Sequence, residues 1–385
     1  MSKNIVWKLM ALVMVTTLLL TACGAPAAEP VEQAVEEKNM TTADGFVCPQ
    51  PAHKMEVTSK ELNLYVWTEY IPTEWKDCFE LVYDIKINHD EYSSNEEMYA
   101  KLDAGSTNYD VVLPTDYIIK LMINKGMLQK LDKAKLPSFD YLDPNYLDLP
   151  FDPGNEYTLP YEGGLDSIIY NATTVPNPPA SYADLWNEEF AGRIVLLDDS
   201  RVVIGMALLT LGYDVNTTDE AQLMEAKEKV AELVKNTKLF DSDSPKTALI
   251  AGDVDLGIVW TGEAYTAAQE DENFKFLYPT EGAILWQDNW AIPASAPHVD
   301  AVYAWINYTM QPDMFYLMLR DFPYLNPNKA AIEYAKINHP DLYEPFMSSN
   351  VTNPPAEALA KSHVIEDVGD ALVIYDTIWT EVKGE

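Results

Sequence analysis

Five points of the sequence that directly follow a short apolar run carry carboxylates, and at four of them an aromatic residue stands beside the carboxylate. A ring face attracts a cation with about 0.5–2 kcal/mol, and a carboxylate makes a charge-assisted hydrogen bond to an ammonium group. The rings also bury methylene groups. A cleft that gathers such residues suits an elongated amine, with its alkyl stem between rings and its charged ends on acids. The five clusters are Trp67-Thr68-Glu69-Tyr70, Pro114-Thr115-Asp116-Tyr117, Asp198-Asp199-Ser200, Trp260-Thr261-Gly262-Glu263 and Trp286-Gln287-Asp288.

Each cluster also has a purely structural interpretation. A Trp at the end of a strand commonly fills a core, and an Asp or Thr before a helix is usually its N-cap, which alone explains Asp199 and Thr261. Glu69 is by itself an ordinary surface acid. The coincidence of three Trp and four acids at the same kind of position favours the functional interpretation.

The elements that position these clusters are short apolar strands that alternate with amphipathic helices. This alternation predicts an α/β protein with largely parallel sheets, in which ligands bind outside the carboxyl ends of the strands. The clusters lie at those ends. The expected strands cover residues 61–67, 85–88, 109–113, 193–197, 255–260 and 283–293, and the expected helices cover 74–83, 94–102, 114–126, 198–211, 219–236, 261 onward, 301–310, 313–319 and 365–382.

The first 23 residues predict export. Lys3 and Lys8 precede an apolar run over residues 10–20, which is shorter than the about 20 residues of a transmembrane helix. Leu20-Thr21-Ala22-Cys23 resembles the lipobox of bacterial lipoproteins, in which the Cys is lipidated and becomes the mature N-terminus. The alternative is an ordinary signal peptide that happens to end at a Cys. We expect residues 1–23 to be a lipoprotein signal, and the protein to be extracytoplasmic (periplasmic or at the cell surface) and lipid-anchored to an inner or outer membrane.

Residues 24–58 read as a flexible acidic tether, because they have low hydrophobicity and no clear helical or strand period. The remaining roughly 325 residues suggest two lobes.

The chain carries 26 Lys and Arg against 61 Asp and Glu; without Lys3 and Lys8 the net charge is 24 − 61 = −37. Such a field repels nucleic acid and attracts cations, although solubility alone is a second explanation.

The remaining cysteines, Cys48 and Cys78, have three open interpretations: a disulfide that fastens the tether to the first lobe, two separate thiols, or a redox pair, against which the long spacing argues. The sequence has no Cys/His metal cluster, no Gly-rich phosphate loop and no Gly-x-Ser-x-Gly elbow. We therefore expect no cofactor, no metal and no catalytic residues.

The strand-end clusters, with further stretches, resemble the bacterial spermidine/putrescine-binding proteins, the solute receptors of polyamine ABC importers. The match runs from about residue 62 to residue 382, and its most specific parts are residues 66–72, 94–102, 109–112 with Pro114, 150–153, 286–288 and 367–369. The resemblance implies a two-lobed periplasmic-binding-protein fold of type II, each lobe a mostly parallel sheet flanked by helices, with crossing hinge strands between them. It implies lobe 1 over residues 59–164 plus 288–335 and lobe 2 over 165–287 plus 336–385.

The resemblance also implies the binding residues. Trp260 and Trp286 match the rings that sandwich the alkyl chain, and Asp288 matches the acid under an amine. Asp199 matches an acid at an amine end, and Glu263 falls where putrescine-type members have Asp and spermidine-type members Ser. The expected ligand-binding residues are Trp67, Glu69, Tyr70, Thr115, Tyr117, Asp199, Trp260, Glu263, Trp286, Asp288 and Tyr324.

Three departures from the family pattern leave the ligand's length and identity open. Val202 stands where the family has Glu, and Ile365 stands where it has Gln. Gly163-Gly164 replaces Trp-Gly, preceded by Glu162 and followed by Asp166. The loss of one amine-binding acid, with others gained, does not decide between putrescine and spermidine.

The leading hypothesis is a monomeric receptor that binds an extracellular polyamine and delivers it to ABC permease subunits in the membrane. Within the binding class, the alternatives are another organic cation, such as thiamine, a betaine or a basic peptide; ferric iron fits less well, because Trp is a poor ligand for it. From a different class, an exported carbohydrate-active enzyme could use Glu69 and Asp288 as a pair of acids. No nucleophile–base constellation supports that enzyme.

Overall fold

The computed structural model describes residues 40–105 and 108–384. The predicted signal segment, Cys23 and residues 24–39 of the predicted tether lie outside the described residues. Within those two ranges, no helix has both the length and the hydropathy needed to span a membrane.

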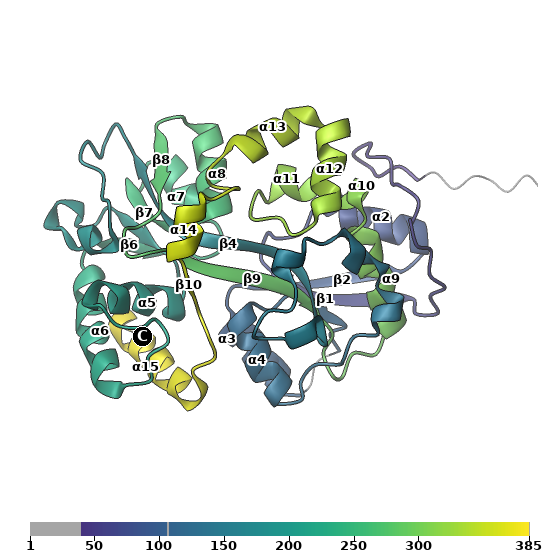
Figure 1. Ribbon diagram of the computed structural model, residues 1–385, viewed down its shortest axis with the longest axis horizontal. Helices are drawn as coiled ribbons and strands as arrows, with labels where there is room; N and C mark the ends of the chain where they lie inside the picture. The colour runs from purple at the N-terminus through teal and green to yellow at the C-terminus, as the bar shows by residue number, and fades with distance from the viewer. Residues whose placement is uncertain (1–39, 106–107, 385) are drawn as a thin grey trace, which may run out of the picture. The chain divides into compact units, whose positions relative to one another are not determined.

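A ten-stranded mixed sheet runs through the described part of the chain (Figure 1). Neighbouring strands follow the order β2-β1-β3-β9-β4-β7-β5-β6, with β10 beside β9 and β8 beside β4. The strands are β1 Glu61–Trp67, β2 Lys86–Tyr92, β3 Val111–Val112, β4 Thr158–Asn171, β5 Ile194–Leu196, β6 Thr237–Phe240, β7 Leu256–Trp260, β8 Phe274–Leu277, β9 Ile284–Ala291 and β10 His363–Val364.

Two parallel groups of strands are joined by two antiparallel ones. β1 pairs in parallel with β2 and β3, and β5 with β6 and β7. β4 and β9 run antiparallel to each other, and each also continues into one group, β9 beside β3 and β4 beside β7. In Figure 1 these two strands cross between the lobes. The expected two-lobed α/β fold with crossing strands is confirmed, although antiparallel β4 and β8 make the sheet of the second lobe mixed.

The helices cover both lobes. In Figure 1, α5, α6 and α15 lie together at one end, and α2 and α9 to α12 lie at the other. The helices are α2 Thr73–Tyr83, α3 Asn95–Asp103, α4 Asp116–Asn124, α5 Ser200–Leu211, α6 Glu220–Leu233, α7 Pro245–Ile250, α8 Thr261–Glu270, α9 Val299–Thr309, α10 Pro312–Phe315, α11 Leu317–Asp321, α12 Lys329–Asn338, α13 Pro340–Ser348, α14 Ala356–Lys361 and α15 Leu372–Lys383. Short 3₁₀ helices lie at Lys133–Lys135, Pro137–Tyr141, Pro144–Tyr146, Pro153–Asn155, Tyr182–Trp186, Glu188–Phe190 and Gly369–Ala371.

Side-chain caps fix where several helices begin. Ser94 accepts a hydrogen bond from the backbone N–H of Glu97 at the start of α3, and Asp199 accepts one from Val202 at the start of α5. The helix expected over residues 365–382 begins only at Leu372. The chain turns before it at Gly369, whose φ of 57° is in the left-handed region.

Strand β4 was not predicted from the sequence. Its residues Pro160, Gly163 and Gly164 all lower strand propensity. The first twelve residues of β4 are nevertheless buried, and β9 pairs with them along one edge. The register shifts between Pro160 and Glu162, next to the residue that has no N–H to donate. Tertiary pairing therefore imposes the strand against local preference.

The predicted tether is too long by residues 40–58, because this segment is fastened to the first lobe. Cys48 and Cys78 form a disulfide that joins it to α2. The backbone N–H of Ala52 donates to the side chain of Gln311 at 2.9 Å, and that of Thr58 donates to Asp300 at 2.7 Å.

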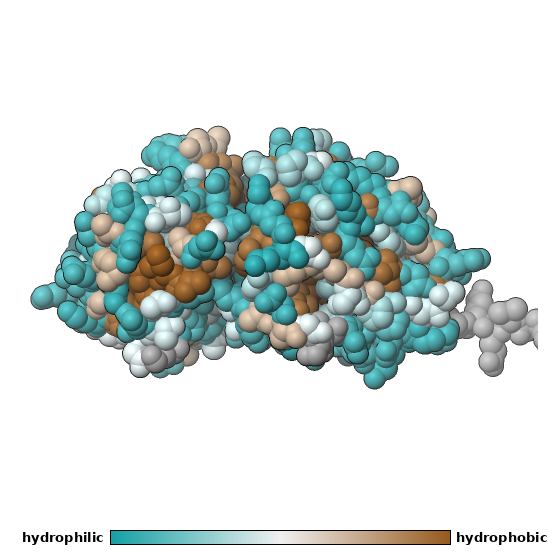
Figure 2. All heavy atoms as spheres, turned by 90° about the horizontal axis from the view of Figure 1, so that it is seen from below, coloured by the Kyte–Doolittle hydropathy of each residue, from teal (hydrophilic) through white to brown (hydrophobic). Residues whose placement is uncertain are grey.

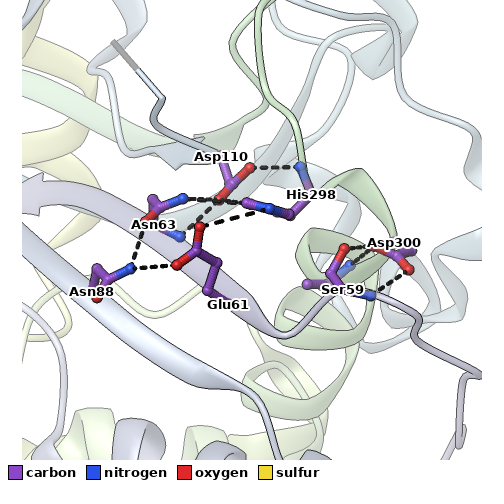
Figure 3. Close-up of polar contacts among 8 residues, drawn as sticks. Ser59, Glu61, Asn63, Asn88, Asp110, His298 and Asp300 are labelled. Atoms are coloured by element: carbon purple, nitrogen blue, oxygen red, sulfur yellow. Dashed lines mark hydrogen bonds and ion pairs between the residues drawn. The ribbon is translucent and has the colours of Figure 1, made fainter.

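A polar cluster holds the N-terminus of α9 against the start of β1 (Figure 3). Asp110 has no exposed side-chain surface and accepts four hydrogen bonds, from the backbone and side chain of Asn63 and from the backbone and ring of His298. Asn88 on β2 donates to Asn63 at 2.7 Å. The bonds to Asp110 satisfy a fully buried carboxylate. The bond between Asn63 and Asn88 joins two residues that lie opposite each other in the register of β1 and β2.

The predicted lobe boundaries stay predictions, and the elements around one of them favour moving it. The boundary at 335/336 falls inside α12, and Phe346 of α13 is buried in the same core as Trp75 and Trp305. The boundaries at 164/165 and 287/288 fall within β4 and β9, where each strand passes from one lobe to the other. We propose that the first lobe extends to residue 348.

The surface seen in Figure 2 is mostly hydrophilic, with hydrophobic patches in both halves of the view, the largest of them in the left half. The 26 Lys and Arg and 61 Asp and Glu of the chain agree with the hydrophilic majority. The large cores lie on both sides of the sheet, around Trp75 and Trp305 on one side and around Ile168 and Leu208 on the other.

The Cys48–Cys78 disulfide closes a loop with a sequence separation of 30. We expect Cys48→Ser/Cys78→Ser to lower the free energy of unfolding by about 3–4 kcal/mol, because the unfolded chain regains the entropy of the open loop. Urea unfolding followed by circular dichroism measures the difference. Reductant should lower the midpoint of the wild type and leave that of the double variant unchanged. Equal midpoints for the two proteins without reductant would contradict this role.

Candidate ligand-binding site

All eleven predicted binding residues line one cavity, which we call the cleft pocket. It has an empty volume of about 790 Å³. Residues at the ends of β1 and β3 reach it from one lobe, residues at the ends of β5 and β7 reach it from the other, and β9 crosses between them. The predicted residues that line it are Trp67, Glu69, Tyr70, Thr115, Tyr117, Asp199, Trp260, Glu263, Trp286, Asp288 and Tyr324.

Further residues line the cleft pocket that the sequence analysis did not select as binding residues. Asn95 was interpreted only as part of a helix start, and Asp243 follows β6, a strand that was not predicted. The acidic run from Asp241 to Asp243 was the available signal for the second of these. The additional lining residues are Thr68, Asn95, Asp116, Val202, Ser242, Asp243, Ile284, Phe322 and Ile365.

The aromatic rings of the cleft pocket are packed edge to face. The ring centroids of Trp260 and Trp286 lie 5.7 Å apart at an interplanar angle of 77°, and those of Trp286 and Tyr324 lie 5.4 Å apart at 69°. The indole N–H of Trp67 donates to the Leu113 carbonyl at 2.8 Å, and that of Trp260 donates to the Ser242 carbonyl at 3.2 Å. The rings are therefore held in place before any ligand enters.

Two glycines make room for two of these rings. A Cβ atom at Gly164 would lie 2.4 Å from the ring of Trp286, and one at Gly262 would lie 2.5 Å from the ring of Tyr324. Both distances are far below van der Waals contact with rigid aromatic atoms. Gly164, the second glycine of the Gly163-Gly164 pair, thus lets Trp286 lie directly against the backbone of β4.

A chain of hydrogen bonds orients Asp288. The amide of Asn95 donates to Thr115 Oγ1 at 2.9 Å, and Thr115 Oγ1 donates to Asp288 Oδ1 at 2.6 Å. The backbone N–H of Thr115 donates back to Asn95 Oδ1 at 3.2 Å. Thr115 therefore supports the acid in the cleft pocket, and its assignment as a direct ligand contact stays a prediction.

Asp199 has both of the roles that the sequence left open. It lines the cleft pocket, and its Oδ1 also accepts the capping hydrogen bond from the backbone N–H of Val202 at 2.9 Å. Thr261 makes no side-chain cap at α8, and its Oγ1 instead accepts a hydrogen bond from the backbone N–H of Leu165 at 3.4 Å.

Negative charge is concentrated and desolvated at the cleft pocket. Among its described lining residues there are six acids and no Lys, Arg or His. Burial raises the pKa of Asp288 to about 7, and the pKa of Asp199 is also raised by burial. Burial and the charge of Asp199 raise the pKa of Glu96 to about 7, and this carboxylate accepts a hydrogen bond from the hydroxyl of Tyr117. A cation entering the pocket would favour ionisation of these acids.

Glu162 places a further carboxyl group next to Asp288. It is fully buried and is the partner of Asp288 across the β4–β9 ladder. Burial, followed by the charge of Asp288, raises its pKa well above the usual value. Glu162 thus adds a desolvated carboxyl group beside Asp288, outside the described lining of the cleft pocket.

Glu263 differs from the other acids because it already has a cationic partner. Both of its carboxylate oxygens lie within 3.0 Å of the Lys246 ammonium nitrogen, at 2.7 and 3.0 Å. Burial raises the pKa of Glu263, and the charge of Lys246 opposes that rise.

Comparisons with known proteins agree with this architecture. Residues 74–344 match the family described as bacterial extracellular solute-binding protein. The spermidine/putrescine-binding periplasmic protein of Salmonella typhimurium is 38% identical over 324 residues, which cover 84% of this chain and 91% of that protein. The putrescine-binding periplasmic protein of Escherichia coli is 31% identical over 349 residues, with 84% and 91% covered.

Solved structures show the same fold. A putative spermidine/putrescine ABC transporter protein from Listeria monocytogenes superposes with a TM-score of 0.80 at 31% identity, over 85% of this chain and 99% of that one. A lipoprotein of Treponema pallidum superposes with a TM-score of 0.72 at 28% identity, over 84% and 99%.

The raised pKa values predict how the stability of the ligand-free protein depends on pH. Asp288 and Glu96 bind protons in the folded state up to about pH 7, whereas in the unfolded chain they ionise near pH 4. The folded state therefore binds more protons between about pH 4 and 7, and the free energy of unfolding falls as pH rises through this window. Urea unfolding at pH 5.5 and 8 should give the higher midpoint at pH 5.5.

Asp288→Asn should reduce this pH dependence, because it removes one of the titrating groups. The matched control is Asp253→Asn, which changes an acid that is 65% exposed and outside the cleft pocket. A midpoint that rises from pH 5.5 to pH 8 in the ligand-free wild type would show that these acids are not proton-bound in the folded state.

Proposed function

The chain belongs to the bacterial extracellular solute-binding protein family, and from this premise we propose that it is the receptor of an ABC importer for a linear polyamine. The observation that supports this most is the composition of the cleft pocket. Its described lining combines six acids with seven aromatic rings and contains no cationic side chain. Relatives named for binding spermidine and putrescine support the same ligand class.

The proposed binding mode divides the ligand between rings and acids. The alkyl chain lies against Trp260 and Trp286, which bury its methylene groups, at about 0.8 kcal/mol for each CH₂ removed from water. An ammonium group donates to Asp288, whose position the Asn95–Thr115 chain holds. Because both lobes contribute to the lining, binding favours the closed arrangement, with β4 and β9 as the hinge.

Val202 and Ile365 shape one wall of the cleft pocket. Both are buried lining residues, 2% and 6% exposed, and both are apolar at positions where the resemblance expects Glu and Gln. This wall offers an alkyl surface near Asp199 and no second acid. Because this apolar wall differs from the family pattern, the experiment must also include other organic cations, such as thiamine or a betaine.

The enzyme alternative is excluded, because the family consists of solute-binding proteins.

We further propose that the protein works outside the cytoplasm as a monomer, attached to a membrane through lipid on Cys23, and that permease subunits are its partners. The Salmonella relative is named as periplasmic and the Treponema structure as a lipoprotein. The lipobox-like Leu20-Thr21-Ala22-Cys23 supports the anchor.

Cys23→Ser should abolish acylation, because serine has no thiol to receive the lipid. Metabolic labelling of bacterial cells that produce the full chain with an alkyne-tagged fatty acid measures this. The wild type should carry the label and sediment with membranes, and the variant should carry no label. Cys48→Ser/Cys78→Ser is the control, and it should remain labelled. An unlabelled wild type in a host that labels its own lipoproteins would exclude the anchor.

The ligand class is tested by calorimetry and thermal shift with the full-length chain in mild detergent. The panel contains putrescine, cadaverine, spermidine, spermine, thiamine, betaine and calcium. A ligand that binds only the folded state raises the unfolding midpoint. Binding must persist at about 0.5 M salt, because a chain of this charge attracts any cation weakly and salt screens that attraction.

We expect Asp288→Asn and Trp286→Ala each to weaken binding of the responding amine by about tenfold or more. The first removes a charge-assisted hydrogen bond of about 1.5–3 kcal/mol, and the second removes the ring face over the alkyl chain. Asp253→Asn, with the same change in charge on the surface, should bind as the wild type does. Unchanged affinity in both pocket variants would refute this binding mode, and a response to thiamine or betaine alone would replace the ligand class.

A further inference from the structure

We propose that Lys246 limits the length of the ligand, because its ammonium group already occupies the amine position at Glu263 and leaves the cleft pocket to a diamine. This inference rests on the proposed function, since it concerns the size of the amine that the same pocket accepts.

The contacts of Lys246 are those that a bound amine makes. Its Nζ donates to Glu263 Oε1 at 2.7 Å, to Glu263 Oε2 at 3.0 Å and to Ser244 Oγ at 3.1 Å. The side chains of Lys246 and Glu263 are only 22% and 12% exposed. An ion pair this enclosed is screened much less by salt than a surface pair.

The pair lies where the cleft pocket meets a second cavity. Glu69, Tyr70, Glu263, Phe322 and Tyr324 line both the cleft pocket and an adjoining groove with an empty volume of about 940 Å³. Lys246 lines the groove and not the cleft pocket. Its ammonium therefore stands beside the passage that an amine longer than the cleft pocket must enter.

Two short helices hold the pair together. Glu263 is in the first turn of α8, directly after Trp260 at the end of β7, and Lys246 is in α7, which packs against α8. The backbone N–H of Lys246 also points to Glu263 Oε2, at 3.4 Å. The backbone N–H and the ammonium of Lys246 thus both contact the Glu263 carboxylate, which holds the carboxylate against α7.

Charge decides which amines this arrangement accepts. A ligand ammonium that approached Glu263 would meet the Lys246 ammonium on the same carboxylate, and like charges at that distance repel strongly in a desolvated site. Asp288 has no such internal cation: Thr115, a neutral donor, is its partner. A diamine can bind Asp288 and another lining acid such as Asp199. The additional amine of a triamine would need Glu263, which Lys246 already neutralises.

The test compares the affinities of putrescine and spermidine by calorimetry, at one salt concentration, for the full-length wild type and two variants. Wild type should prefer putrescine. Lys246→Met should raise the ratio of spermidine affinity to putrescine affinity by about tenfold, or about 1.4 kcal/mol, because Glu263 then accepts the additional amine. Lys246→Met/Glu263→Gln should show no such rise, because the acid is removed together with its partner.

Lys238→Met is the matched control. It also removes one positive charge from the same lobe, but the Lys238 side chain is 45% exposed and its partner is the surface residue Asp253. Its affinity ratio should equal that of the wild type. If circular dichroism shows that Lys246→Met does not fold, Lys246→Gln, which keeps a hydrogen-bond donor beside Glu263 without the charge, replaces it.

The outcomes separate this inference from the proposed function. If the wild type binds neither amine, the proposed ligand class fails. If the wild type binds amines but prefers spermidine, or if the ratio in the Lys246 variant equals that of the wild type, the pair only joins α7 to α8 and Lys246 does not select the ligand. An equal rise in the Lys238 control would assign the effect to net charge.

Discussion

The central constraint on this structure is negative charge that is buried at the cleft pocket, whose described lining has no cationic side chain. Asp288 and Asp199 line this pocket, and Glu96 accepts a hydrogen bond from the lining residue Tyr117. Burial raises the pKa of each acid, and at Asp199 the charge of the buried Arg201 opposes that rise. Neutral donors such as Thr115 fix the direction of a carboxylate but do not cancel its charge. Asp288 and Glu96 therefore bind protons near neutral pH in the ligand-free protein, and in the proposed binding mode a ligand ammonium would favour their ionised form.

The two crossing strands, β4 and β9, carry several of these pocket residues and also connect the two lobes. β9 carries Trp286 and Asp288, and β4 carries Glu162 opposite Asp288 and Gly164 against Trp286. β9 continues beside β3 of one parallel group, and β4 continues beside β7 of the other. In the proposed binding mode a ligand on Asp288 would therefore act where the two lobes join, between the clusters at the ends of β1 and β7.

The sequence was sufficient to predict a site residue where that residue lies next to a strand in the chain. Trp67, Trp260 and Trp286 lie in or at the ends of apolar strands, so the rule for α/β sheets placed them in one cleft. Sequence reasoning failed where distant segments decide the structure. β4 forms in spite of Gly163 and Gly164 because β9 pairs with it, and residues 40–58 are fastened because Cys48 meets Cys78.

Two acids of the cleft pocket show how the same electrostatic problem has two solutions. At Glu263 the counter-cation is part of the chain, since the Lys246 ammonium lies 2.7 Å away and opposes the rise in the pKa of Glu263. At Asp288 the counter-cation is absent from the described lining, and only hydrogen-bond donors oppose the effect of burial on the pKa. The first arrangement needs no ligand, whereas in the proposed binding mode a ligand ammonium completes the second. In the sequence each acid follows a Trp within three residues. Only the fold shows that the Lys246 side chain, which comes from α7, pairs with one of them and not with the other.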